Sequence, residues 1–546
     1  TCKLNCPFLI RVSYSTMKEL YVVKEVNLEH NHEVSAEYNA RIPQNRKLDD
    51  LQTDYVKPLI HQDISVKTLH NIAQERFNKP ITVKDMANLV HRERKNAAGS
   101  DISALEKIIN DIKSSDPNCF VEVLTFEESE KVEGVYFQYS KMQSVLETFG
   151  HMVFVDVTYN VNLEGYHLMT FLVADGDNNG QPVGYAYISN ESKPVLNLVL
   201  EAFIKSLKIS NRKTVDIFMV DKDMKCISSL RQFFPLCQIL LCYFHVMKHF
   251  KEKINRDVTG SLDYKESVLQ QIRLVITSGS LEQYQANFEV LQGISPGKFI
   301  DYYRKNWEGD IQQWFILYER RSLFHIGNDT NNLIESHHRV IKKDLKRSHH
   351  LPQSTRILFE SYHRRFMEKA HKTHIDQKMK RPMNLTADEN LKHYYKLCTE
   401  FAFKLIKKQL DIFHILQSGG YIVESKAGQP DVLVVQDHRK IFHNVSVQNW
   451  SCDCNFFENF HLPCQHLFKV RSVKKLPLFC EQSVHSRYSN TTAQSIFSLD
   501  VPNQANVLAP SGGFDIRQSK LVSASDRFNY CKGVMNNICD VSSDLS

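Results

Sequence analysis

The chain has 546 residues, of which 42% are apolar, enough for several domains with ordinary buried cores. It contains no apolar run of about 18 residues and no signal-peptide pattern at its start, so we expect neither a membrane span nor a secretory leader. The net charge of +6, with histidines neutral, is compatible with a nucleic-acid partner but too small to establish one.

Cysteine and histidine usage indicates metal binding. The chain has 13 cysteines, an odd number, and several lie near other cysteines or histidines at ligand-like spacing. This pattern favours reduced thiols in an intracellular protein over a disulfide framework.

The first such cluster lies in residues 1–35. Two alternating segments, 8–14 and 19–26, predict a β-hairpin between a pair of cysteines and a pair of histidines. Two thiolates and two imidazoles suffice for a tetrahedral zinc ion, although buried thiols without a metal are the simpler alternative. The candidate ligands are Cys2, Cys6, His30 and His32.

Residues 36–115 predict a polar linker followed by helices. The stretches 64–77 and 81–90 carry apolar residues at helical spacing, and the second runs into a basic end at 91–95. Two short helices with a basic end are typical of a helix-turn-helix, but a small helical bundle without DNA contact fits the same pattern.

Two apolar segments further along each end on an acid. Residues 152–155 lead into Asp156, and residues 215–220 lead into Asp221. Short apolar runs of this kind are typical of buried strands. A strand that delivers a carboxylate at its end places a metal ligand on a rigid element, whereas a solvated aspartate is the simpler alternative.

A third acid, Glu335, follows a predicted helix start at Thr330 or Asn331. It lies beside Arg339 and Lys342 on one stripe of that helix, off the apolar face. A carboxylate with cations along one stripe suits a metal-bound phosphate, although a charge run is usually a solvated face. The residues expected on the apolar face are Leu333, His337, Val340 and Ile341.

The segments between these acids predict a mixed α/β unit. Residues 167–176 and 181–188 form two strands joined by a turn, 194–207 a helix, and 238–242 a fifth strand. The long stretch 250–324 is mostly helical by its pattern, and we interpret its aromatic residues as the core of an insertion rather than as platforms for bases.

A basic helical region, 346–418, follows the third acid. The cations around its start either form a solvated face or neutralise DNA phosphates. These cations are Lys342, Lys343, Lys346 and Arg347.

Residues 419–475 contain the second Cys/His cluster. Short predicted strands lead to a C-x-C pair, a loop, and a C-x-H pair that enters an apolar helix. Three thiolates and one imidazole complete a tetrahedral zinc site. The candidate ligands are Cys452, Cys454, Cys464 and His466. Residues 476–546 are rich in Ser, Asn and Asp, and we expect them to be largely disordered.

The order of these motifs resembles the transposase domain of Mutator-like elements. The resemblance rests on D-x-T-Y-x-x-N beginning at Asp156, V-D-x-D around Asp221, C-x-x-H at 242–245 and the segment around Glu335. The C-x-C and C-x-H pairs are similar to the SWIM zinc finger of these transposases and of regulators derived from them. The N-terminal cluster is similar to the zinc fingers of WRKY and FLYWCH proteins.

The resemblance implies a ribonuclease-H-like α/β fold over residues 116–345, with an all-α insertion at about 246–328. Small zinc-binding, β-rich modules at 1–35 and 419–475 would flank it.

The resemblance also implies a function. Asp156, Asp221 and Glu335 would hold catalytic Mg²⁺, and zinc would be structural. The protein would cleave and join DNA in the nucleus, acting on transposon terminal repeats and target DNA as an oligomer, with protein partners bound through the SWIM module. The alternative is a catalytically inactive, domesticated regulator that binds DNA or protein.

Overall fold

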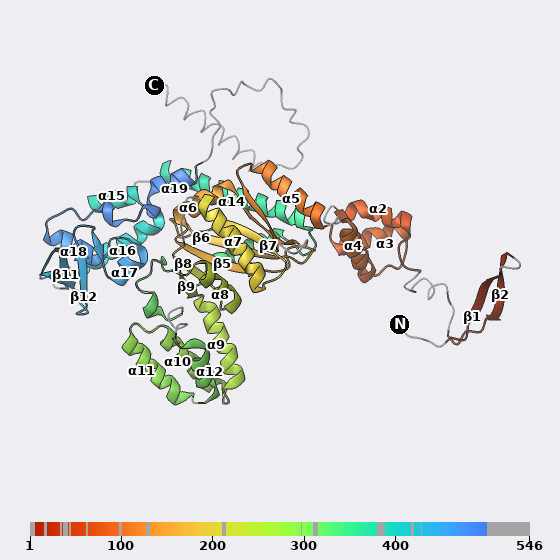
Figure 1. Ribbon diagram of the computed structural model, residues 1–546, viewed down its shortest axis with the longest axis horizontal. Coiled ribbons are helices and arrows are strands. Elements are labelled where there is room, and N and C mark those ends of the chain that lie inside the picture. Colours follow the sequence, from red (N-terminus) through yellow and green to blue (C-terminus); the bar gives the residue numbers. More distant parts are fainter. Residues whose placement is uncertain are drawn as a thin grey trace, which may run out of the picture. The chain divides into compact units, whose positions relative to one another are not determined.

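The computed structural model describes residues 6–15, 19–32, 35, 42, 45–61, 64–97, 101–126, 132–209, 215–295, 297–309, 315–378, 388–416, 420–426 and 428–498. Its largest sheet has 7 strands in the order β3-β4-β7-β6-β5-β8-β9 (Figure 1). The strands are β3 (Phe120–Thr125), β4 (Val132–Gln138), β5 (Met152–Thr158), β6 (His167–Ala174), β7 (Gly180–Ile188), β8 (Ile217–Val220) and β9 (Gln238–Leu241).

This sheet is mixed, which confirms the predicted α/β class. β8 runs parallel to both β5 and β9, while β5, β6, β7, β4 and β3 pair antiparallel in turn. Parallel neighbours require crossover connections, and helices α7 (Lys193–Ile209) and α8 (Met224–Phe233) supply them.

The two faces of the sheet bury different side chains because residues alternate along each strand. One face contributes Val153, Phe171 and Phe218 to a core with α6 (Ser140–Phe149) and α7. On this face the ring of Phe171 stacks on Phe203 of α7 with centroids 4.4 Å apart. Burying one such phenylalanine contributes about 1.5–3 kcal/mol. The other face contributes Phe154, Leu172 and Met219 to a second core.

Helices fill the stretch between β9 and the helix that carries Glu335. They are α9 (Tyr243–Asp257), α10 (Leu262–Ile276), α11 (Leu281–Ile294) and α12 (Lys298–Trp307), drawn in green in Figure 1. Trp307 and Tyr303 are fully buried here and pack on Phe250, with ring centroids 4.5 Å and 5.8 Å away. These aromatic side chains therefore serve packing rather than base stacking.

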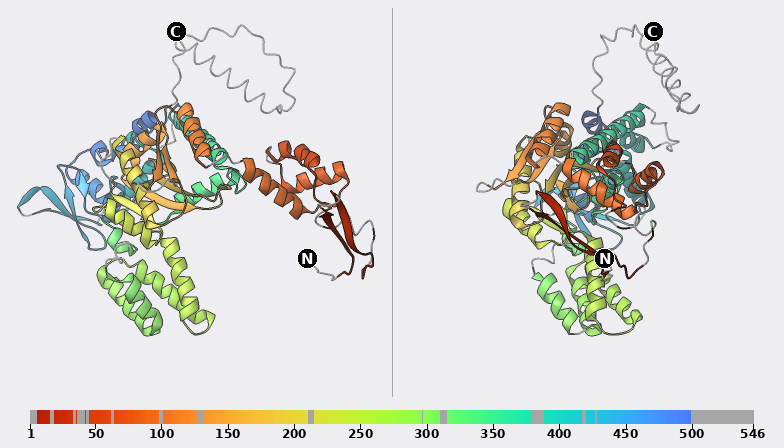
Figure 2. Two further views of the ribbon diagram at one scale, coloured as in Figure 1. Left: turned by 45° about the vertical axis from the view of Figure 1, so that its right-hand side comes forward. Right: turned by 90° about the vertical axis from the view of Figure 1, so that its right-hand side faces the viewer.

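The second core continues into the C-terminal part of the described chain (Figure 2). The helices of this C-terminal part are α13 (Asn332–Asp344), α14 (Leu351–Lys378), α15 (Glu389–Leu397), α16 (Glu400–Leu416), α17 (Asn455–Phe460) and α18 (Gln465–Val473). The buried residues of α14 belong to the first core. A 4-stranded antiparallel sheet joins them, made of β10 (Ile422–Lys426), β11 (Gln429–Gln436), β12 (Phe442–Ser446) and β13 (Ser451–Cys452).

The expectation that residues 476–546 are largely disordered is wrong for residues 476–498, which are ordered. They contain α19 (Asn490–Ile496) and the buried residues Arg487 and Phe497. The Arg487 guanidinium donates a hydrogen bond of 2.6 Å to the carbonyl of Ala174 at the end of β6. Contacts with such distant segments order this stretch, so local periodicity did not reveal it. Residues 499–546 lie outside the described residues.

The N-terminal elements form their own units. β1 (Leu9–Ser15) and β2 (Leu20–Asn27) make the predicted hairpin. Helices α2 (Asp50–His61), α3 (Val66–Phe77) and α4 (Val83–Ala97) share a separate core built on Val56, Leu69 and Met86, and α5 (Asp101–Ser115) follows. None of the described helices is long and apolar enough to cross a membrane.

We predict that Lys369→Ala strongly destabilises the fold. The ammonium of Lys369 on α14 lies 2.9 Å from a carboxylate oxygen of Asp175 and 2.9 Å from one of Asp177, and the Asp175 side chain is fully buried. Removing the cation leaves a buried carboxylate unpaired, which costs about 3–5 kcal/mol. Urea denaturation measures the loss. The matched Lys372→Ala, at an exposed position of the same helix, should change stability by less than about 0.5 kcal/mol.

Candidate active site and zinc site

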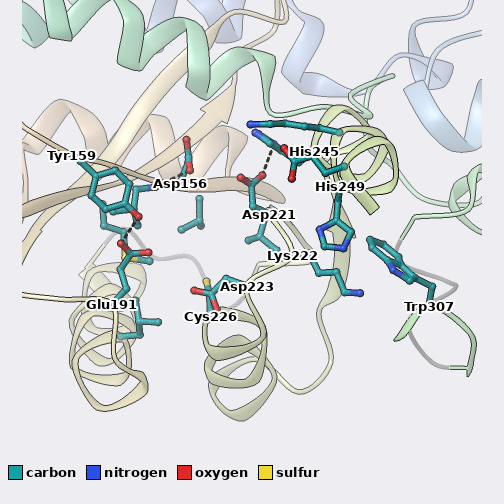
Figure 3. Close-up of a pocket in the computed structure, with 17 residues that line it drawn as sticks. Asp156, Tyr159, Glu191, Asp221, Lys222, Asp223, Cys226, His245, His249 and Trp307 are labelled. Atoms are coloured by element: carbon teal, nitrogen blue, oxygen red, sulfur yellow. Dashed lines mark hydrogen bonds and ion pairs between the residues drawn. The ribbon is translucent and has the colours of Figure 1, made fainter. Parts of the chain in front are cut away.

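The parallel pairing of β5 with β8 brings two predicted acids together. Phe154 lies opposite Met219 in that pairing, so Asp156 and Asp221, each two residues further on, lie side by side on the same face. Neighbouring strands lie about 4.8 Å apart. Figure 3 draws both residues among those that line one pocket. Asp221 directly follows β8 as predicted, whereas Asp156 lies inside β5, which continues to Thr158. The two predicted acids still lie next to each other in the fold.

Helix α13 brings the third acid to the same edge. Asn331 stands at its N-cap, and its side chain donates a hydrogen bond of 3.0 Å to Oδ1 of Asp221 instead of capping the helix. Glu335 lies on the first turn, about one-third exposed. The buried face is Ile334, His337, His338 and Ile341. The sequence placed His337 and Ile341 on it correctly, and Leu333 is partly buried against the second core. Val340, expected to be buried, is 38% exposed.

Two histidines stand among the three carboxylates. Nδ1 of His245 lies 2.7 Å from Oδ1 of Asp221, and its Nε2 lies 3.6 Å from Oε1 of Glu335. The Asp221 carboxylate, and then the Cys242 thiol, raise the pKa of His245 to about 10, because they outweigh the opposing effect of burial. Nδ1 of His338 lies 3.2 Å from Oδ2 of Asp156. Each acid therefore has a histidine beside it.

A cavity of about 430 Å³ opens in front of the strand ends. Asp156, Asp221 and His245 line it, and Glu335 is not among its lining residues. At its far side the Lys222 ammonium lies 3.4 Å from the centre of the Trp307 ring, and burial lowers the pKa of Lys222 to about 8.

Asp223 also lines the cavity but has a structural task. Its carboxylate accepts a hydrogen bond of 2.9 Å from the amide of Lys225 as the N-cap of α8. It does not take the place predicted for Asp221.

The three acids suit a divalent cation by the kind of atom they offer, but the three together are not among the groups of described side chains whose ligand atoms all lie within 4.8 Å of one another. Asp156, Asp221 and Glu335 offer carboxylate oxygens, which Mg²⁺ prefers. Oε1 of Glu335 is buried, and no described hydrogen-bond donor reaches it, because 3.6 Å from His245 is too long. The ligand atoms of Asp221, Cys242 and His245 all lie within 4.8 Å of one another. A cation shared by Asp221 and Glu335 would take the place that His245 holds here.

The second Cys/His cluster is fully assembled. The ligand atoms of Cys452, Cys454, Cys464 and His466 lie within 4.8 Å of one another, and all four residues are buried. Nδ1 of His466 is 3.7 Å from Sγ of Cys452 and 3.8 Å from Sγ of Cys464. Tetrahedral zinc with Zn–S bonds of about 2.3 Å places its ligand atoms about 3.7 Å apart, so these residues fit zinc.

The N-terminal cluster is assembled in part. The ligand atoms of Cys6, His30 and His32 lie within 4.8 Å of one another, with Sγ of Cys6 3.4 Å from Nδ1 of His30. The fourth predicted ligand, Cys2, lies outside the described residues.

Comparison with known proteins shows what the chain is similar to. Residues 110–240 match the family described as zinc finger SWIM domain-containing protein 1/3, RNaseH-like domain. Over part of its length the chain is therefore similar to SWIM zinc-finger proteins. These matches confirm the resemblance found in the sequence and support an RNaseH-like nature for residues 110–240.

Two curated relatives show the extent of this similarity. Human "Uncharacterized protein ZSWIM9" is 21% identical over 362 residues, which cover 65% of this chain and 53% of that protein. "Putative protein FAR1-RELATED SEQUENCE 10" of Arabidopsis thaliana is 19% identical over 484 residues, covering 83% of this chain and 67% of that protein. The chain thus spans about half the length of the human relative.

Sequence reasoning missed part of the site. It noted Cys242 and His245 as a C-x-x-H pair without seeing that His245 lies between two of the acids. It assigned no role to His338. A histidine three residues after Glu335 lies beside it on the helix surface, so the spacing could have indicated His338 as a neighbour of the acids. The sequence predicted Asn331 only as a possible helix cap, and nothing in it indicated the hydrogen bond from Asn331 to Asp221.

We predict that Cys464→Ser removes close to one zinc ion per chain. Serine offers no thiolate, and three ligands bind zinc far more weakly than four. Metal analysis of the purified full chain measures the ratio against the wild type. The matched Cys480→Ser, at a buried cysteine outside the cluster, should keep the wild-type zinc content. Equal zinc in both variants would contradict the assignment.

Proposed function

We propose that this protein binds DNA and cleaves and joins its phosphodiester bonds with divalent metal ions, as a DDE transposase does. The observation that supports the proposal is that Asp156 and Asp221 lie side by side on an RNaseH-like sheet, and that His245 contacts Asp221 on one side and lies 3.6 Å from Glu335 on the other. Strand ends and a first helical turn are rigid supports, and such supports hold catalytic ligands in place.

The residues have distinct tasks in this proposal. Asp156, Asp221 and Glu335 would hold Mg²⁺, which supplies an activated water or 3′-hydroxyl and stabilises the leaving 3′-oxygen. His338 holds the Asp156 carboxylate in place, and its other nitrogen lies 3.0 Å from Oγ1 of Thr170 on β6. Asn331 does the same for Asp221.

DNA contacts come from several parts of the chain in this proposal. The exposed cations Lys342, Lys343, Lys346 and Arg347 at the end of α13 bind phosphates. The N-terminal zinc finger and the α2–α4 bundle supply base contacts, which specify sequence. The SWIM zinc finger binds DNA or a protein partner, α9–α12 form the all-α insertion, and the protein acts in the nucleus as an oligomer on DNA.

A second candidate is a regulator that binds DNA without cleaving it. One observation favours it: His245 already offsets the charge of Asp221 and stands between Asp221 and Glu335. Such an arrangement stabilises the fold without a metal ion. The two candidates differ in one measurable property, metal-dependent strand cleavage.

We predict that Asp221→Asn lowers Mg²⁺-dependent nicking of supercoiled plasmid by at least about 100-fold. Outer-shell changes at metal sites already cost about 10–100-fold, and this change removes a ligand oxygen's charge. The matched Asp223→Asn should retain activity, because asparagine also caps helices well. Absence of nicking by the wild type with Mg²⁺ or Mn²⁺ would favour the regulator.

We predict that changing Lys342, Lys343, Lys346 and Arg347 to Ala weakens binding to all DNA duplexes alike. The slope of log affinity against log salt should flatten by about 0.9 for each phosphate that the variant no longer neutralises. Fluorescence anisotropy at several salt concentrations measures this slope. Lys404→Ala with Lys407→Ala serves as control, because these cations already pair with Glu400 and Asp411 on α16. An unchanged slope in the fourfold variant would remove this surface from the DNA interface.

A further inference from the structure

The loop before α13 contains an unusual backbone turn. Ile326 and Gly327 are consecutive residues with φ of 60° and 71°. Isoleucine is β-branched and rarely adopts this left-handed conformation, so its surroundings must hold it there. Ile326 is 1% exposed and belongs to the second core.

One residue of α17 holds this turn. The backbone carbonyl of Asn459 accepts a hydrogen bond of 3.1 Å from the amide of Ile326, and its Oδ1 accepts one of 2.8 Å from the amide of Gly327. Its Nδ2 lies 2.6 Å from Nε2 of His325. Asn459 thus contacts three successive residues of the loop, through its backbone and through both ends of its amide.

The neighbours of Asn459 close around the same turn. A Cβ atom added at Gly327 would lie 3.0 Å from the ring of Phe460. The ring of His461 stacks on Phe324 with centroids 4.1 Å apart and planes 9° apart. The end of α17 is therefore shaped to this one loop.

The same loop fixes the start of α13 and two groups of the candidate active site. The amide of Tyr243 donates to the carbonyl of Asp329 at 2.9 Å, two residues before His245. Asn331 reaches Asp221, and its carbonyl accepts a hydrogen bond of 2.9 Å from the amide of Glu335. A shift of the turn at Ile326 would move these contacts together.

The anchor of α17 is the second Cys/His cluster. Cys454 is the N-cap of α17, and its Sγ accepts a hydrogen bond of 3.5 Å from the amide of Phe457. One short helix therefore carries a zinc ligand at its start and Asn459 near its end. The path from the cluster to Glu335 consists of one helix, one loop and the hydrogen bonds that join them.

We propose that Asn459 is a positioning residue for the acid cluster, so that the SWIM module is part of the support of the active site. That the acid cluster is catalytic rests on the proposed function. That Asn459 holds the loop before α13 does not depend on catalysis. Asn459 fixes the left-handed turn at Ile326 and Gly327, the turn fixes the start of α13, and α13 carries Glu335 and is preceded by Asn331.

The test compares variants of the full chain by Mn²⁺ binding, followed by electron paramagnetic resonance. We expect Asn459→Ala to weaken binding at the acid cluster by about 10-fold or more, as outer-shell changes do. Asn459→Asp keeps the acceptor for the Gly327 amide and should restore most of the affinity. Asn455→Ala, at an exposed position of the same helix, should bind Mn²⁺ as the wild type does.

Hydrogen exchange gives a readout that does not require metal binding. Asn459→Ala should speed exchange of the amides of Glu335 and Tyr243, whose bonds depend on the loop, while amides within β6 and β7 stay unchanged. Gly327→Ala should have the same effect from the loop side. Gly428→Ala is its control, since Gly428 also has a positive φ, of 75°, but an added Cβ there meets no atom within 4 Å.

The outcomes separate the two proposals. If the wild type does not bind Mn²⁺, the nuclease proposal fails, and faster exchange at Glu335 and Tyr243 in Asn459→Ala still supports the positioning role. If exchange at these amides is unchanged, the positioning role is overturned whatever the metal result. Equal Mn²⁺ affinity in wild type and Asn459→Ala, with the wild type binding normally, also overturns it.

Discussion

The convergence of like charges at one edge of the sheet is the constraint on which the rest of this structure depends. Pairing of β5 with β8 brings Asp156 and Asp221 side by side, and carboxylates so placed repel each other unless a cation lies near them. His338 and His245 supply nearby imidazoles from α13 and from the start of α9. The strand ends, α13 and the C-x-x-H segment therefore form one electrostatic unit.

The sequence predicted the parts of this unit that local patterns encode. An apolar run followed by an acid can be recognised within a few residues of sequence. For that reason Asp156 and Asp221 could be predicted together with the strands that carry them. Glu335 was found through helical spacing and resemblance, but the prediction for the buried face of its helix wrongly included Val340 and left out Ile334 and His338. The reason is that α13 packs on the sheet through His338 as well as through apolar residues, and a polar side chain on a buried face breaks the pattern.

What the sequence did not predict depends on contacts between distant segments. Arg487 reaches the end of β6, and Asn459 holds a turn that lies more than a hundred residues before it. Both are polar residues that form hydrogen bonds with backbone groups. Such bonds produce no periodic pattern in the sequence from which they could be predicted. The left-handed backbone conformation of Ile326 was also not predicted. Only its neighbour Gly327 is a residue type that usually indicates such a turn.

The chain keeps two kinds of metal ligand apart. Thiolates favour zinc, and carboxylate oxygens favour magnesium, so the buried cysteine cluster and the acid cluster need not compete for the same ion. Cys242 lies beside the acids and is the exception. Its Sγ accepts a hydrogen bond of 3.2 Å from the amide of Asn331, which gives the sulfur a structural task at the start of α13. While that bond persists, the sulfur is engaged in the backbone of the loop before α13, and the side chains around it are carboxylates and imidazoles.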